Sequence, residues 1–135
     1  MQLLKPVWVS AEGQAFMSID IHPDGNRFAT GGQGEDCGRV SIWNIKPILD
    51  EKAARDKDVP KLLTQMDHHL GCVNCVRWSN NGKYLASGGD DKLVSNLNTD
   101  LAFRKSILRL HVKEGALISS LDSNLYFLDN DLAKE

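Results

Sequence analysis

The chain has 135 residues, of which 41% are hydrophobic and 25% are charged. This composition is typical of a soluble globular domain and argues against collagen-like, disordered and disulfide-scaffold chains. Its 16 basic residues against 18 acidic ones give a formal net charge of -2, so there is no basic excess to neutralise phosphates. We therefore expect one domain that makes no direct sequence-specific contact with nucleic acid.

The sequence also argues against a membrane or secreted protein. Its uncharged stretches are much shorter than the roughly 20 apolar residues of a membrane span, and residues 1–6 lack the apolar stretch of a signal peptide. Cys37, Cys72 and Cys75 are an odd number of cysteines, which favours reduced thiols over a disulfide framework. We expect an intracellular chain with no membrane partner.

Two segments of the chain repeat each other. Residues 16–43 and 73–94 align without a gap through their first halves, with Val73 standing 57 residues after Phe16. In this alignment Gly25 falls on Gly82, and a Gly-Gly pair at residues 31–32 falls on another at 88–89. Such self-similarity is the signature of a repeat architecture.

Each repeat has the pattern of short strands around a tight turn. In the first, Ile19 and Ile21 alternate with polar neighbours, residues 23–26 supply turn chemistry, and residues 28–30 and 40–43 predict two further strands. In the second, Val76 and Trp78 alternate in the same way before a turn at 80–83 and strands at 84–87 and 93–94. Both repeats therefore predict antiparallel β-structure.

Three clusters could be mistaken for chemical sites. Residues 31–34 are glycine-rich, but their spacing to Gly38 fits neither phosphate-binding motif and no helix follows, so a strand-turn-strand connection is favoured. A second cluster has the spacing of zinc ligands, but no matching pair lies elsewhere in the chain; it comprises His68, His69, Cys72 and Cys75. A third cluster contains the residue types of a hydrolytic triad; it comprises His69, Ser87 and Asp91.

The second unit resembles a WD repeat, one blade of a β-propeller. His69 is followed at the expected spacing by Val73, Val76 and Trp78, and the sequence continues into LASGGDD; Trp43-Asn44 stands at the WD dipeptide of the first unit. A repeat period of roughly 40 to 45 residues implies an insertion in the offset of 57. It is the charged stretch PILDEKAARDKDVP, where Glu51 and Arg55 are spaced for one helical turn.

The resemblance is closest to the HIRA family of histone-regulatory WD-repeat chaperones. It rests on LLKPVWV, IHPDGNRFATGGQGEDCGRVSIWN, VPKLLTQMD and HLGCVNCVRWSNNGKYLASGGDDKLV, and extends from residue 1 to about residue 94. Beyond it Leu97 stands near the position of the expected tryptophan. Residues from 103 onward are similar to the last blade of the same family, with its first strand at Ile107, Leu108 and Leu110 and later strands at 117–120 and 125–128.

The resemblance implies an all-β chain made of an incomplete WD40 β-propeller with two to three four-stranded antiparallel blades. The expected parts are an amino-terminal strand over 1–10 that closes the last blade, WD repeat 1 over 11–45, a charged inserted loop over 46–67, WD repeat 2 over 68–98 and a degenerate last blade over 103–130. Three blades cannot close a ring of ordinary geometry. We expect a shortened isoform, a diverged gene or an incomplete gene model.

The same resemblance assigns His69, Ser87 and Asp91 to a structural hydrogen-bond network rather than to catalysis, which Leu97 leaves without its tryptophan. His22 and His111 are expected at the surface or a blade edge. No enzyme activity, cofactor or metal is expected. Partner-contact residues cannot be identified from one sequence; the exposed candidates are residues 50–58 and 33–36, for which a solvated loop is the simpler interpretation.

HIRA membership implies a nuclear chromatin protein that acts in replication-independent nucleosome assembly with histones H3.3 and H4 and in transcriptional repression. Its propeller would be a platform for protein subunits of a histone chaperone complex, of the ubinuclein type, with the histones bound indirectly. Two alternatives are a generic WD-repeat scaffold outside chromatin and a small metal or hydrolytic enzyme built on His69, which zinc analysis would test.

Overall fold

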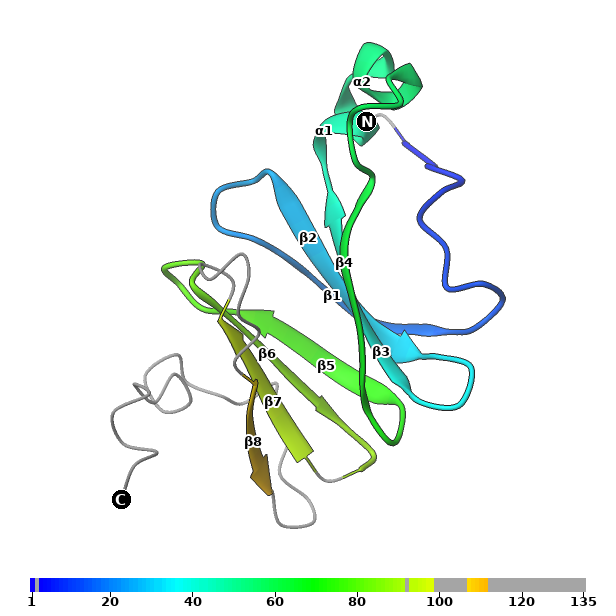
Figure 1. Ribbon diagram of the computed structural model, residues 1–135. Coiled ribbons are helices and arrows are strands. Elements are labelled where there is room, and N and C mark those ends of the chain that lie inside the picture. Colours follow the sequence, from blue (N-terminus) through cyan, green and yellow to red (C-terminus); the bar gives the residue numbers. More distant parts are fainter. Residues whose placement is uncertain (2, 92, 99–106, 112–135) are drawn as a thin grey trace.

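The computed structural model describes residues 1, 3–91, 93–98 and 107–111, which form two four-stranded antiparallel sheets (Figure 1). Each sheet is a meander in which consecutive strands are neighbours. The described residues are thus all-β apart from two short helices, as the sequence predicts. No helix in this part of the chain is long and apolar enough to cross a membrane.

The first sheet, here called blade 1, contains the first repeat and the two helices that interrupt it. Its strands are β1 (Phe16–Ile21), β2 (Arg27–Gln33), β3 (Gly38–Asn44) and β4 (Leu62–His69), with α1 (Lys46–Leu49) and α2 (Glu51–Arg55) between β3 and β4. The helix at the predicted place carries the expected i,i+4 pair, because Arg55 Nη2 lies 3.5 Å from Glu51 Oε2. Helix α2 begins after Asp50, whose side chain accepts from the Lys52 N–H.

The second sheet, blade 2, contains the second repeat. Its strands are β5 (Val73–Trp78), β6 (Tyr84–Gly89), β7 (Leu93–Asn98) and β8 (Ile107–His111). The repeat is visible in the backbone, because Gly25 and Gly82 occupy equivalent turns and both have a φ of 73°. The register also repeats, since β1 and β5 each shift by one residue after their first pair.

The structure corrects three boundaries that the sequence suggested. The stretch 46–67 is not all loop: from Leu62 it is β4, which pairs with β3 as the fourth strand of blade 1. Among residues 1 and 3–10 there is no strand. The strand Ile107–His111 does not begin a separate blade; it pairs with β7 as the fourth strand of blade 2. The predicted strands 117–120 and 125–128 lie outside the described residues.

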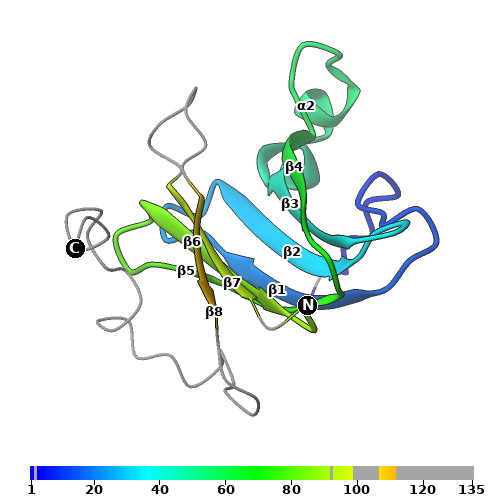
Figure 2. The same cartoon turned by 60° about the horizontal axis from the view of Figure 1, so that its bottom comes forward.

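The two blades pack face to face through β5, which lies against β1, β2 and β3 (Figure 2). One apolar cluster joins them, formed by Ala29, Val40, Ile42, Met66, Val73, Val76, Trp78 and Leu85. The two blades approach closely at Gly31, which has no side chain: a Cβ added there would lie 2.7 Å from Val73 Cγ1 and 2.8 Å from Val76 Cγ1. The blades therefore share one core rather than forming separate units.

Candidate functional site

Three residues singled out by the sequence meet at the junction of the blades. His69 lies at the end of β4, Ser87 lies in β6, and Asp91 lies in the turn after β6. The His69 Nδ1 is 2.9 Å from Asp91 Oδ2 and 3.1 Å from Oδ1, while its Nε2 is 2.9 Å from Ser87 Oγ. Because a carboxylate only accepts, Nδ1 carries a proton, and in the neutral ring Nε2 then accepts from the serine hydroxyl.

This network is buried and connects two sheets. His69 is 2% exposed and Ser87 is 5% exposed, and the Asp91 side chain is 4% exposed. His69 belongs to blade 1, whereas Ser87 and Asp91 belong to blade 2. Asp91 also accepts from the Leu70 N–H at 3.0 Å, which fixes the chain as it passes from one blade to the next. Buried polar groups joined in this way favour a single arrangement of the strands.

The geometry disfavours a hydrolytic reading of the same three residues. A nucleophile has to reach a substrate, but the Ser87 hydroxyl is directed at His69 from a position that is 5% exposed. The arrangement instead satisfies buried donors and acceptors, and it holds the β4–β5 connection against the β6–β7 turn. The three residues thus form a buried hydrogen-bond network that joins the two blades.

Blade 1 has a separate hydrogen bond at the positions that Ser87 and Leu97 occupy in blade 2. Trp43 Nε1 donates to Thr30 Oγ1 at 2.9 Å within the sheet, and both residues are buried. Phe28 is stacked on Trp43, with ring centroids 6.4 Å apart, and Trp8 contacts the same ring at 6.1 Å. Blade 1 thus has the serine-like hydroxyl and the tryptophan.

In blade 2 the tryptophan position is taken by a leucine. Phe28 pairs with Trp43 in blade 1, and the equivalent Leu85 pairs with Leu97 in blade 2. The register therefore places Leu97 where the sequence comparison suggested the tryptophan should stand. The network formed by Ser87 and Asp91 of blade 2 with His69 of blade 1 therefore has no indole donor at this position.

A second contact between the blades was missed by the sequence reading. His22 is 7% exposed, so it is not a surface residue: its Nε2 lies 2.9 Å from the Gly82 carbonyl oxygen. Its ring meets Trp78 edge-on, with centroids 4.6 Å apart. The turn after β1 therefore contacts the equivalent turn after β5. In the sequence, the only sign that these two turns are related is the 57-residue repeat offset.

The candidate zinc cluster is not assembled as a site. Both ring nitrogens of His69 lie against Ser87 and Asp91, and burial together with the nearby Asp90 carboxylate raises the pKa of the Cys72 thiol. A raised pKa disfavours the thiolate that binds zinc. Within the part of the chain that the structure describes, no three His, Cys, Asp or Glu side chains are grouped to hold a metal ion.

The glycine-rich stretch serves close packing. Gly31 faces Val73 and Val76 of blade 2, and a Cβ on Gly32 would collide with the Ala15 carbonyl oxygen. These glycines lie in or next to strand β2, with no helix beginning behind them. Of the two candidate contact loops, Glu35 and Asp36 are exposed, as is most of the stretch 50–58.

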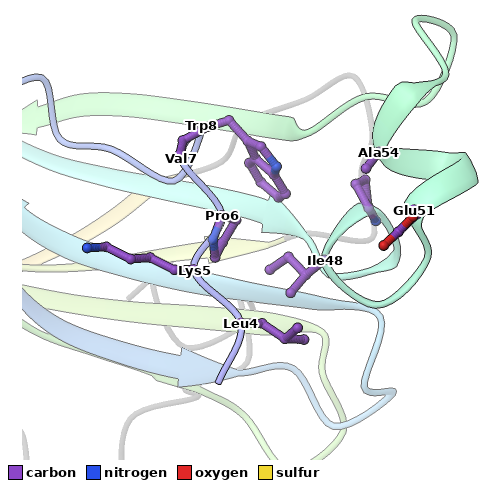
Figure 3. Close-up of a pocket in the computed structure, with 9 residues that line it drawn as sticks. Leu4, Lys5, Pro6, Val7, Trp8, Ile48, Glu51 and Ala54 are labelled. Carbon is purple, nitrogen blue, oxygen red and sulfur yellow. The ribbon is translucent and has the colours of Figure 1, made fainter. Parts of the chain in front are cut away.

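A pocket of about 310 Å³ lies away from the network, between the amino-terminal segment and the inserted helices (Figure 3). Its wall is mostly apolar, with Lys5 and Glu51 as its charged members. The lining residues are Leu4, Lys5, Pro6, Val7, Trp8, Pro47, Ile48, Glu51 and Ala54. The amino-terminal residues thus pack beside the insertion rather than joining a sheet.

Comparison with known proteins identifies the class that these blades define. The family "WD domain, G-beta repeat" matches residues 6–44 and 60–95, so the chain belongs to the WD-repeat family. A solved structure, the Cps50 (Swd1) beta-propeller domain of Myceliophteria thermophila, superposes with a TM-score of 0.53 at 11% identity. That match covers 72% of this chain and 29% of the other, and it supports the propeller fold alone. The described blades are part of an incomplete WD40 β-propeller.

Within this family the chain is a HIRA-type WD-repeat segment. It is 68% identical over 94 residues to Protein HIRA of Takifugu rubripes and 64% identical over 94 residues to Protein HIRA of Homo sapiens. Each match covers 70% of this chain. The chain spans 9% of the length of these curated relatives.

Proposed function

We propose that the chain is a HIRA-like subunit of a histone chaperone complex, acting as a protein-interaction platform and not as an enzyme. The observation that carries this proposal is the 64–68% identity with HIRA proteins over 94 residues. A WD-repeat scaffold binds through its faces and loops and needs no catalytic group. The burial of the His69, Ser87 and Asp91 network supports a structural role for the residues that most resemble a catalytic set.

The process we propose is replication-independent nucleosome assembly with histones H3.3 and H4, together with transcriptional repression in the nucleus. The chain would contact a ubinuclein-type subunit directly and the histones indirectly. The net charge of -2 supports protein partners over direct binding to DNA.

A binding titration against an immobilised ubinuclein-type subunit tests this function. The matched control is a WD-repeat segment of similar length from a scaffold that acts outside chromatin, titrated against the same immobilised subunit. We expect saturable binding by the chain and no binding by the control segment. In cells, we expect the fluorescently tagged chain to accumulate in nuclei. Equal binding of the chain and the control segment, or a tagged chain confined to the cytoplasm, would favour the generic scaffold instead.

A further inference from the structure

The turn between β5 and β6 contains a chemically reactive pair of residues. Asn81 precedes Gly82, and it is the only asparagine in this sequence that is followed by a glycine. Asparagine is a thermolabile residue type. A glycine after it has no side chain to hinder its own backbone nitrogen from approaching the asparagine side chain. The exposed Asn81 is therefore the position of this chain where loss of the side-chain amide is chemically easiest.

The reaction at this pair is deamidation through a cyclic imide. Hydroxide removes the proton of the Gly82 backbone nitrogen, and this nitrogen attacks Cγ of Asn81. A bond forms between the backbone nitrogen and Cγ, the bond between Cγ and the side-chain nitrogen breaks, and ammonia leaves with a proton from water. Water then opens the ring at one of its two carbonyl carbons. Opening at one carbon leaves aspartate at position 81, and opening at the other leaves isoaspartate.

The folded turn withholds both reacting groups. The Gly82 N–H donates to the Ser79 carbonyl oxygen at 2.9 Å, so its proton is not available to hydroxide while this bond exists. The Asn81 side chain is also held, because its Oδ1 accepts from Ser79 Oγ at 2.7 Å and from the Lys83 N–H at 3.0 Å. Attack requires these bonds to break. The rate therefore depends on how often the turn opens.

The first repeat shows that aspartate fits at this position of the turn. Asp24 stands 57 residues before Asn81. Its Oδ1 accepts from the Asn26 N–H at 2.8 Å, as Asn81 Oδ1 accepts from the Lys83 N–H. The backbone bond of the turn is repeated too, because the Gly25 N–H donates at 2.9 Å to the carbonyl oxygen three residues before it. The aspartate product should therefore preserve the turn.

The isoaspartate product does not fit in this way. Its main chain runs through the former side chain, which places one more carbon atom between the Cα of residue 81 and the Gly82 nitrogen. Gly82 lies at the contact between the blades, where its carbonyl oxygen is 2.9 Å from His22 Nε2. A Cβ added to Gly82 would collide with the His22 ring, which is 7% exposed. The longer chain therefore has to move Gly82 relative to His22.

We propose that Asn81 is a deamidation site whose rate the fold controls, and that its isoaspartate product loosens the contact between the two turns. The turn delays the reaction while the blades are packed. Once the reaction has taken place in an open turn, the isoaspartate opposes closing. The modification thus makes a transient opening of the blade junction permanent, and the inference does not rest on the proposed function.

Peptide mapping by mass spectrometry, on the purified chain aged at neutral pH, tests the control by the fold. In guanidinium chloride we expect residue 81 to exchange its side-chain amide for a carboxyl group faster than any other asparagine of the chain. Without denaturant we expect this rate to fall about tenfold or more, because opening the turn breaks three hydrogen bonds. Asn81→Gln is the matched control: it keeps a side-chain amide but needs a larger ring, so it should stay unmodified.

Thermal melts of the products test the effect on the blades. Aged chains with isoaspartate at position 81, identified by isoaspartyl methyltransferase labelling and located by peptide mapping, should melt at least about 4 °C below the unmodified chain. Freshly purified Asn81→Asp should melt with the unmodified chain, because the aspartate of the first repeat makes the same hydrogen bond. The Asn81→Gln chain, aged in parallel, shows how much of any loss comes from other damage.

Three results would overturn the proposal. Residue 81 could deamidate equally fast with and without denaturant, so that the turn would not control the reaction. Another asparagine could react first in the unfolded chain. Chains with isoaspartate at position 81 could melt with the unmodified chain, or no lower than Asn81→Asp, which would mean that the longer main chain leaves the contact with His22 intact.

Discussion

Removing the Asp91 carboxylate should weaken the junction of the two blades more than any exposed substitution nearby. The carboxylate accepts from His69 Nδ1 at 2.9 Å and from the Leu70 N–H at 3.0 Å, and its side chain is 4% exposed. Each hydrogen bond to a buried charged group contributes about 1.5 to 3 kcal/mol, and Asp91→Ala leaves both donors without this acceptor. We expect a loss of about 3 kcal/mol in the free energy of unfolding, against a total of about 5 to 15 kcal/mol.

The neighbouring carboxylate supplies the matched control. Asp90 is exposed and its side chain accepts from Asn74 Nδ2 at 2.6 Å. Its backbone N–H bonds to the Cys72 carbonyl oxygen, a contact that Asp90→Ala retains. An exposed polar pair contributes little, so we expect Asp90→Ala to cost less than about 1 kcal/mol.

Urea unfolding followed by tryptophan fluorescence measures both variants, because Trp8 and Trp43 pack together at blade 1 and Trp78 lies in blade 2. Asp91→Ala should lower the midpoint and the melting temperature, the latter by roughly 10 °C or more. Both blades should lose stability together, since His69 belongs to one and Asp91 to the other. The reasoning is refuted if Asp91→Ala and Asp90→Ala unfold at the same urea concentration.

Two further predictions concern blade 1 and the turns. Trp43→Phe deletes the donor to Thr30 Oγ1 and should cost about 1 to 2 kcal/mol in urea unfolding; adding Thr30→Val should recover part of it, because no polar group is then left unpaired. Gly82→Ala and Gly25→Ala impose the same strain at a φ of 73°, but only the first places a Cβ against His22. In thermal melts Gly82→Ala should therefore be the more destabilising by at least about 1 kcal/mol, and equal melting temperatures would contradict the contact between the turns.

The strands of each repeat could be predicted because their signals are local. Alternation at Ile19 and Ile21, followed by turn residues around Gly25, identifies a hairpin without knowledge of its neighbours. The 57-residue offset then carries the same interpretation to blade 2 as far as the Gly-Gly pair at residues 88–89. Beyond that pair the WD pattern places Leu97 near the tryptophan position, and the register of β6 and β7 pairs Leu97 with Leu85.

The sequence could not reveal which sheet a strand joins or which side chains a neighbouring blade buries. The apolar pattern of residues 107–110 predicts a strand correctly, but pairing with β7 is a non-local choice that periodicity does not encode. His22 has the sequence context of an exposed turn, and it is buried only because Gly82 and Trp78 of the other blade lie against it. Functional contacts are less predictable still, because they depend on a partner surface.

Size-exclusion chromatography with light scattering, on the purified chain alone and mixed with a ubinuclein-type subunit, tests the central claim most directly. The account predicts a folded particle of discrete mass, because the two blades share one apolar core and one buried hydrogen-bond network. It also predicts that this particle co-elutes with the subunit. A soluble aggregate, or a discrete particle that leaves the elution of the subunit unchanged, would contradict the claim that these blades form a working interaction module.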